Sequence, residues 1–119
     1  MINPVELIKL PILEPENGAC YFNWEVPEKI TYFEGHFPNN PVLPAFAILD
    51  ISMEIIRRIA RNSSLEIKSI KTGKFYEVIK PKHKIRIQVK NIGSSEWILT
   101  WLDRAQTDKK LARVHIETS

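Results

Sequence analysis

The chain has 119 residues, a length typical of one domain, with 44% hydrophobic and 26% charged residues, the ordinary mixture of a globular protein. No run approaches the roughly 18 apolar residues of a membrane span, and the first residues lack the basic start and apolar stretch of a signal peptide. The single cysteine, Cys20, excludes an internal disulfide and favours a reducing compartment. We therefore expect one domain, residues 1–119, in the cytoplasm.

The net charge of +3 is spread along the chain and is not gathered in one tail. A solvated basic surface is the simpler interpretation, and a docking face for an acidic partner is the alternative. The sequence shows no metal-knuckle spacing, no Gly-rich phosphate loop and no aromatic–basic RNA-binding signature. These patterns give no reason to expect a metal or a nucleic-acid partner.

The first half of the chain begins with an alternating segment, Ala19–Val26, which predicts a strand with Phe22 and Trp24 on its apolar face. Three prolines between Pro38 and Pro44 predict an ordered or extended loop without regular structure. Pro44 then suits the first position of a helix, where its missing N–H costs nothing.

Residues from Ala45 to about Arg61 are predicted to form that helix. Its first three turns are apolar on nearly every side, which predicts burial on all sides. Its end carries Arg57, Arg58 and Arg61. Cations interact favourably with the negative C-terminal end of the helix dipole, and their presence indicates that the helix emerges into water.

The second half of the chain is rich in predicted strands. One long strand is expected over Lys68–Ile79, with a bulge at Gly73. Three more are expected at residues 84–90, 96–104 and 110–117, and the short polar loops between them predict hairpins. The fold class is therefore α+β, with one long central helix wrapped by a curved antiparallel sheet of about five or six strands.

The proline-braced loop and the helix that follows it carry the two residues best suited to chemistry, His36 and Asp50. Histidine changes charge near neutral pH and serves as a general acid or base, but it is also common as a hydrogen-bonded structural residue. A carboxylate among apolar neighbours is expensive to bury, which indicates either a proton-transfer role or a hydrogen-bonded brace for the loop.

The start of the helix adds a third element. Because Pro44 has no N–H, the first free donors belong to Ala45, Phe46 and Ala47. Such donors stabilise negative charge on an oxygen, for example a thioester carbonyl that becomes an enolate. A base, an acid and these donors are the parts needed to remove a proton beside a carbonyl and expel a β-hydroxyl group.

The motif Gly35-His36-Phe37-Pro38-x-x-Pro41-x-x-Pro44, with an acid 14 residues after the histidine, resembles the signature of bacterial 3-hydroxyacyl-acyl-carrier-protein dehydratases. An aspartate at that position is similar to the dehydratase/isomerase branch and the aryl-polyene type. The segment Lys74–Pro81 resembles the next strand of this family, so that the resemblance covers roughly Ala19 to the C-terminus.

This resemblance implies a hotdog fold and a homodimer in which the histidine of one subunit meets the acid of the other. It implies that His36 removes the α-proton, that Asp50 holds or protonates the departing hydroxyl, and that the Ala45 N–H polarises the thioester carbonyl. It implies an acyl tunnel along the helix and no metal or organic cofactor. The substrate-binding residues expected on this basis are Gly35, Phe37, Pro44, Ala45 and Phe46.

An acidic acyl carrier protein is the partner that such a substrate implies, and the clustered Arg57, Arg58 and Arg61 are its expected docking residues. Two features depart from the family pattern and leave alternatives open: Ala45, and the segment Ile51–Glu54, which replaces the small and amide residues that usually follow the acid. Ala45 replaces the usual glycine, which keeps a non-catalytic acyl-binding module in view, and a hotdog thioesterase that uses Asp50 to activate water is a third reading.

Several other residues have simpler interpretations. Glu54 is either a second acid or the partner of Arg58 in an i,i+4 ion pair. His83 and His115 are expected at the surface. Buried packing is expected for the remaining candidates: Cys20, Trp97 and Trp101.

Overall fold

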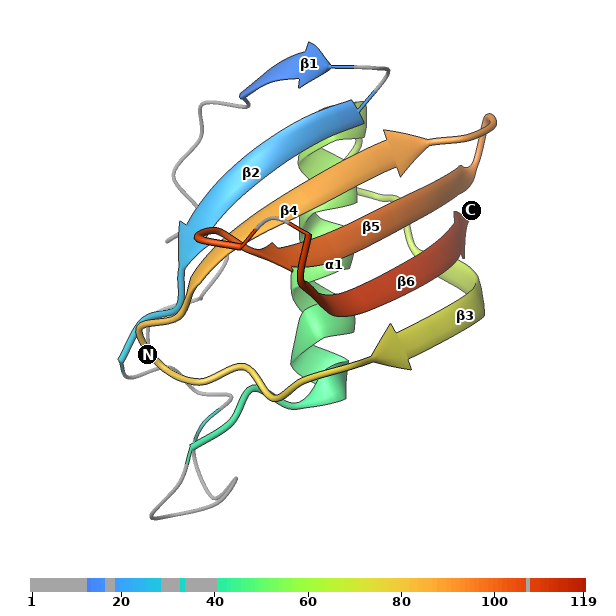
Figure 1. Cartoon of the computed structure of the whole chain (residues 1–119). Coiled ribbons are helices and arrows are strands. Elements are labelled where there is room, and N and C mark those ends of the chain that lie inside the picture. Colours follow the sequence, from blue (N-terminus) through green and yellow to red (C-terminus); the bar gives the residue numbers. More distant parts are fainter. Residues whose placement is uncertain (1–12, 17–18, 29–32, 34–40, 107) are drawn as a thin grey trace.

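The computed structural model describes residues 13–16, 19–28, 33, 41–106 and 108–119, which form one helix and a six-stranded antiparallel sheet (Figure 1). The elements are β1 Leu13–Glu16, β2 Ala19–Glu25, α1 Ala45–Ala60, β3 Ile67–Phe75, β4 Lys84–Asn91, β5 Glu96–Asp103 and β6 Lys110–Thr118. The strands are ordered β1-β2-β4-β5-β6-β3, so β3 lies at one edge. The predicted α+β fold is confirmed.

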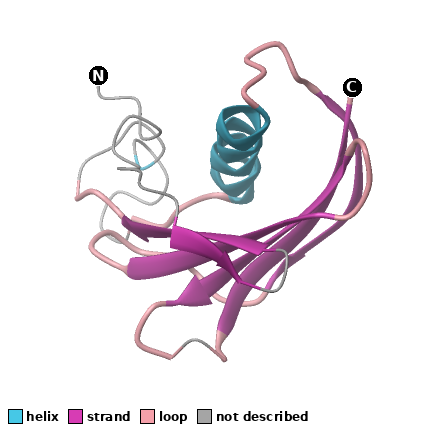
Figure 2. Ribbon diagram, turned by 90° about the horizontal axis from the view of Figure 1, so that it is seen from above, coloured by secondary structure: helices cyan, strands magenta, loops and turns pink. Residues whose placement is uncertain are grey.

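The sheet curves around α1, which lies against its concave face (Figure 2). The alternating patterns predicted for β2, β4, β5 and β6 are confirmed, because one side of each strand is buried beneath the helix. The strand side chains that form this core are Phe22, Trp24, Ile85, Ile87, Val89, Trp97, Leu99, Trp101, Ala112, Val114 and Ile116. Trp97 and Trp101 therefore belong to the core, as expected, whereas Cys20 is only half-buried against it.

The helix departs from its prediction in one respect: it is not buried on all sides in the single chain. Ala47, Ile51 and Ile55 face the sheet and are buried, but Phe46 and Asp50 are exposed. The physical reason is that, among the described elements, the sheet covers only one side of the helix (Figure 2).

The ends of α1 follow from local sequence. Pro44 is the N-cap, one position earlier than predicted, with φ −72° and ψ 159°. Arg61 closes the helix in the left-handed conformation, with φ 54°, and the Asn62 N–H donates to the Arg57 carbonyl oxygen at 3.0 Å. Arg57 and Arg58 occupy the last turn, where cations interact favourably with the negative end of the helix dipole. Among the described residues no helix has the length and hydropathy needed to cross a membrane.

The strand predicted over Lys68–Ile79 is shorter than expected, and the bulge predicted at Gly73 is wrong. Gly73 pairs in register with Val114, and the irregularities of β3 fall nearer its start, between Ile67 and Ser69 and between Ile70 and Thr72. The strand ends at Phe75 because the next two N–H groups, of Tyr76 and Glu77, both donate to the Leu111 carbonyl oxygen. The chain then leaves the sheet and runs beside the start of α1.

Candidate active site

A cavity of about 230 Å³ opens where α1 begins. Its walls come from the helix and from the segment that follows β3; they are formed by Leu43, Ala45, Ile48, Phe75, Tyr76, Glu77 and Val78. Most of these side chains are apolar, and Glu77 is the one charged residue among them. A mostly apolar pocket with one polar wall is suited to an acyl chain whose polar end faces outward.

Backbone hydrogen bonds hold the two walls together. The Leu43 N–H donates to the Ile79 carbonyl oxygen at 2.7 Å, which ties the approach to the helix to the segment after β3. The Glu77 carboxylate lies 3.0 Å from Lys109 Nζ. This hydrogen bond and charge raise the pKa of Lys109 above its ordinary value. The pocket wall is therefore fixed at both its backbone and its side chains.

The first N–H groups of α1 lie beside this cavity. No side chain of the described residues caps the helix, and the N–H groups of Ala47 and Ile48 donate to the Pro44 carbonyl oxygen at 3.0 and 3.3 Å. The geometry of an α-helix leaves the Ala45 N–H without an intrahelical acceptor. Ala45 lines the cavity and Pro44 is buried behind it, so the donor predicted from the sequence is next to a pocket.

Asp50 lies on the open side of α1, one turn after Phe46, which is 60% exposed. The burial expected from its apolar sequence neighbours is absent in the single chain, because Ile48 and Ile51 turn toward the sheet while Asp50 turns away from it. The structure thus presents Phe46 and Asp50 on one accessible face, near the cavity at the helix start. The other predicted site residues of the loop, Gly35, His36 and Phe37, lie outside the described residues.

The predicted docking arginines are already engaged within the chain, with one exception. Arg57 contacts Glu54 at 3.2 Å and Glu66 at 3.3 Å, and its Nε donates to the Leu65 carbonyl oxygen at 2.7 Å. Arg58 lies 3.8 Å from Glu54, which confirms the i,i+4 pair predicted for that glutamate. Arg61 is exposed and makes no ion pair within the described part of the chain.

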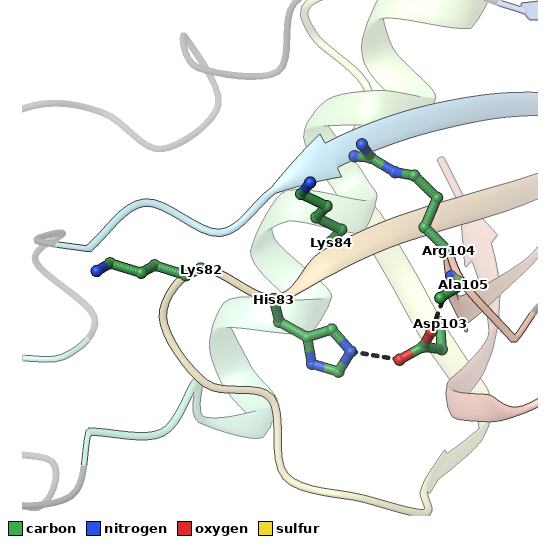
Figure 3. Close-up of a pocket in the computed structure, with 6 residues that line it drawn as sticks. All are labelled: Lys82, His83, Lys84, Asp103, Arg104 and Ala105. Carbon is green, nitrogen blue, oxygen red and sulfur yellow. Dashed lines mark hydrogen bonds and ion pairs between the residues drawn. The ribbon is translucent and has the colours of Figure 1, made fainter.

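A second cavity, of about 460 Å³, lies where β4 begins and β5 ends (Figure 3). It is lined by Lys82, His83, Lys84, Asp103, Arg104 and Ala105. The expectation that His83 is a surface residue is wrong, because its ring is half-buried and its Nε2 lies 2.8 Å from Asp103 Oδ2. His115 is half-buried as well, packed on the sheet 3.9 Å from Glu96.

The pairing register of β4 and β5 is the feature from which the second cavity could have been predicted. Ile85 lies opposite Asp103 in the β4–β5 hairpin, so His83 is two positions along from the residue that faces the aspartate. Diagonal neighbours of this kind are within reach of long side chains. Counting outward from the predicted loop at residues 91–95 would have placed His83 directly opposite Asp103, the position that Ile85 occupies in the observed register, and would still have brought the two side chains together.

The architecture is shared by solved structures of low sequence identity. The dehydratase heterocomplex ApeI:P from Xenorhabdus doucetiae is similar with a TM-score of 0.77, 18% identity and 98% of each chain covered. An uncharacterized protein from Erwinia carotovora subsp. atroseptica is similar with a TM-score of 0.72 and 20% identity, over 89% of this chain and 88% of the other. An acyl-CoA hydrolase mutant from Staphylococcus aureus has a TM-score of 0.57 and 15% identity, over 85% and 64%. These likenesses confirm the hotdog fold.

The sequence itself matches one family model, that of the ApeI dehydratase, over residues 13–113. The chain therefore belongs to the ApeI-like dehydratase family. No curated protein matches it in a direct sequence comparison.

Proposed function

We propose that this protein removes water from a 3-hydroxyacyl thioester held on an acyl carrier protein, giving a trans-2-enoyl thioester for fatty acid or polyene-type lipid synthesis. The observation that carries the proposal is the arrangement at the start of α1. An apolar cavity, a helix N–H at its wall and an acid on the adjoining open face lie together in a member of a dehydratase family.

Each part has a chemical role. His36 takes the α-proton from C2 of the acyl chain, and the electron pair left behind is shared with the thioester carbonyl, whose oxygen the Ala45 N–H stabilises. That electron pair then forms the C2=C3 double bond as the C3–O bond breaks, and Asp50 gives a proton to the departing 3-hydroxyl group, which leaves as water. The channel in which the acyl chain lies is shaped by Gly35, Phe37, Pro44 and Phe46. The reaction needs no redox cofactor, because it is neither an oxidation nor a reduction, and the proposal uses side chains and a backbone N–H alone.

The proposed catalytic unit is a homodimer, or a larger assembly built from such dimers. The edge strand β3 and the segment after it expose apolar side chains: Ile67, Ile70, Phe75, Tyr76 and Val78. Phe46 adds an exposed ring on the helix. An open strand edge with apolar side chains favours pairing with a second chain, which would also cover the open side of α1. The similar ApeI:P structure is a heterocomplex, so a homologous partner chain is an outcome that the oligomer measurements must distinguish.

Docking of the carrier protein on the arginine cluster remains part of the proposal, and the structure sharpens which residue to test. Glu54 and Glu66 already neutralise much of the charge of Arg57 and Arg58. Arg61 is the freest of the three, so Arg61→Glu is expected to raise KM for a carrier-bound substrate and to leave turnover of a small-molecule thioester unchanged. An unchanged KM for the carrier-bound substrate would rule out this docking site.

The experiment that tests the reaction follows formation of enoyl thioester by its ultraviolet absorbance, using 3-hydroxyacyl thioesters of short, medium and long chains. We expect turnover by the wild type and losses of at least about a hundredfold in His36→Ala and Asp50→Asn, the usual size of a lost general acid or base. Glu54→Gln is the matched control, because it removes a carboxylate one turn further along the helix.

Two other products would redirect the assignment. Release of free thiol without enoyl formation would identify a thioesterase, in which Asp50 activates water. Binding of acyl thioester by a folded dimer without any turnover would identify an acyl-binding module.

A further inference from the structure

The cavity at the β4–β5 end is separate from the one at the start of α1, since the two share no lining residue. Three of its six lining residues are cations: Lys82, Lys84 and Arg104. Asp103 is its one carboxylate, so with His83 neutral three positive charges and one negative charge leave a net charge of +2. This excess of positive charge is concentrated in one hollow of the surface.

Both oxygens of the Asp103 carboxylate are hydrogen-bonded to groups other than the three cations. One oxygen lies 2.8 Å from His83 Nε2, and the other accepts the N–H groups of Ala105 at 2.9 Å and Gln106 at 3.0 Å. Figure 3 shows this carboxylate turned toward the histidine ring, away from the lysine and arginine head groups. The aspartate therefore makes no direct ion pair with the cations of the described pocket, although its charge still counts in the net charge of +2.

Backbone contacts hold Arg104 beside Lys84. The Arg104 N–H donates to the Lys84 carbonyl oxygen at 3.0 Å, and its Nη2 lies 3.5 Å from the Ile85 carbonyl oxygen. The buried Arg104 Nε has no hydrogen-bond acceptor in the part of the chain that the structure describes. A buried cationic N–H without an acceptor is costly, and two neighbouring like charges add to the cost. An anion in the pocket would offset the repulsion between the two cations.

Lys82 occupies a strained turn at the rim of the same pocket. Its φ is 69°, a conformation that favours glycine, and its N–H donates to the Val26 carbonyl oxygen at 2.7 Å. Its ammonium lies 3.9 Å from Glu28 Oε1, and both side chains are mostly exposed, so this pair holds the lysine only weakly. A lysine in a backbone conformation that glycine adopts at lower energy indicates that its charge has a function.

We propose that this pocket binds a phosphate group of the carrier to which the acyl thioester is attached, an inference that rests on the proposed function. A phosphate dianion matches the net charge of +2, and the fork of an arginine guanidinium suits two phosphate oxygens at once. The two lysines supply the additional point charges.

The position of the pocket suits such a carrier. Val78 lines the acyl cavity and Lys82 and Lys84 line the phosphate pocket, so a single segment of chain serves both. The seven residues from Val78 to Lys84 are separated by six steps, which span at most about 20 Å when extended. A long arm with a thioester at one end and a phosphate at the other therefore has a site for each end on the same segment.

The first test measures binding calorimetrically with four probes: inorganic phosphate, pantetheine, 4′-phosphopantetheine and coenzyme A. Phosphopantetheine and coenzyme A are expected to bind about tenfold more tightly than pantetheine, the effect of one or two charge-assisted contacts. Tight binding of phosphopantetheine identifies the phosphate of a carrier arm, whereas a preference confined to coenzyme A identifies its nucleotide phosphates. Equal affinity for pantetheine and both phosphorylated probes overturns the proposal.

The second test uses variants that differ only in where a charge is lost. Lys84→Gln and Arg104→Gln are expected to remove the tenfold preference, whereas Lys90→Gln, an exposed lysine further along β4, is expected to keep it. Lys82→Gln and Lys84→Gln alter exposed side chains, so they test the pocket even if Arg104→Gln does not fold. Retention of the preference in both folded lysine variants, or equal weakening by Lys90→Gln, contradicts the site.

Failure of this inference is distinguishable from failure of the proposed function. Dehydration of a phosphate-free N-acetylcysteamine thioester, together with phosphate-independent binding, would refute the pocket alone. Phosphate-dependent binding that disappears in Lys84→Gln, without dehydration of any substrate, would refute the reaction alone.

Discussion

The indole N–H of Trp101 donates to Ser52 Oγ across 3.1 Å in the interior, where both residues are fully buried. This bond joins the middle of α1 to the middle of β5. Residues two apart on a helix point about 200° away from each other. By holding Ser52 against the sheet, the bond therefore sets the rotation of the helix that turns Asp50 to the open side.

Replacing Ser52 with alanine is expected to lower the free energy of unfolding by about 1–3 kcal/mol, because it leaves a buried indole N–H without an acceptor. Urea denaturation measures the loss, and Ser63→Ala, at an exposed serine after the helix, is the control and is expected to change little. In a Trp101→Phe background the cost of Ser52→Ala should shrink, because no donor remains. An equal cost in both backgrounds would show that the bond does not contribute.

The His83–Asp103 pair predicts a pH dependence of stability. The hydrogen bond from His83 is the largest cause that lowers the pKa of Asp103 below its ordinary value of 3.8, followed by the N–H group of Gln106. A carboxyl whose pKa is lowered by folding stabilises the fold above its unfolded pKa, and this contribution disappears as the pH falls through the folded value.

Asp103→Asn is accordingly expected to destabilise the protein at pH 7 by about 1 kcal/mol, since the asparagine oxygen still accepts N–H groups but carries no charge. The difference from the wild type should narrow as the pH falls below about 3.8. Thermal unfolding from pH 7 to pH 2 measures it, with Asp108→Asn at an exposed aspartate as the control. A difference that is constant over this range would contradict a charge effect.

Much of the fold was predictable from the sequence because the alternation in β2, β4, β5 and β6 matches one buried face of a sheet. The periodicity of the sequence does not show which sides of the helix are covered by other parts of the protein. The same apolar pattern is expected whether a side of the helix is buried by the sheet of its own chain or by a partner chain. The exposure of Phe46 and Asp50 in the single chain could therefore not be predicted. The end of β3 also depends on long-range bonds to the Leu111 carbonyl oxygen.

The surroundings of the predicted site depend partly on local and partly on long-range structure. The Ala45 N–H could be placed because helix geometry is local. The partners of the cavity wall, from Phe75 to Val78, come from a segment 30 residues away whose position only the sheet topology determines. The His83–Asp103 pair likewise depends on hairpin register, which composition does not reveal.

The methyl group of Ala45 offers a test of the helix start. Ala45→Val adds bulk at an exposed position that lines the cavity, so activity on 3-hydroxyacyl thioesters is expected to fall at least about tenfold while the fold is kept. The intrinsic helix cost is only about 0.5 kcal/mol. Ala60→Val makes the same change at the exposed end of α1 and should leave activity unchanged. Equal activity of the two variants would contradict a substrate bound against the Ala45 side chain.

The apolar edge around β3 makes the assembly testable as well. Val78 is 62% exposed in the single chain and sits beside the edge strand, so Val78→Glu should place a charge in a dimer interface and shift the protein toward the monomer in sedimentation velocity. Ile92→Glu, at a residue 49% exposed beyond the end of β4, makes the same chemical change and should leave the assembly intact. Because Val78 also lines the acyl cavity, loss of dehydration is read in Ile70→Glu, on the same edge but outside the cavity, where it should disappear together with the dimer if the active unit shares residues between subunits. A monomeric Val78→Glu with full activity would show that one chain holds a complete site, and a dimer unaffected by Val78→Glu would place the interface elsewhere.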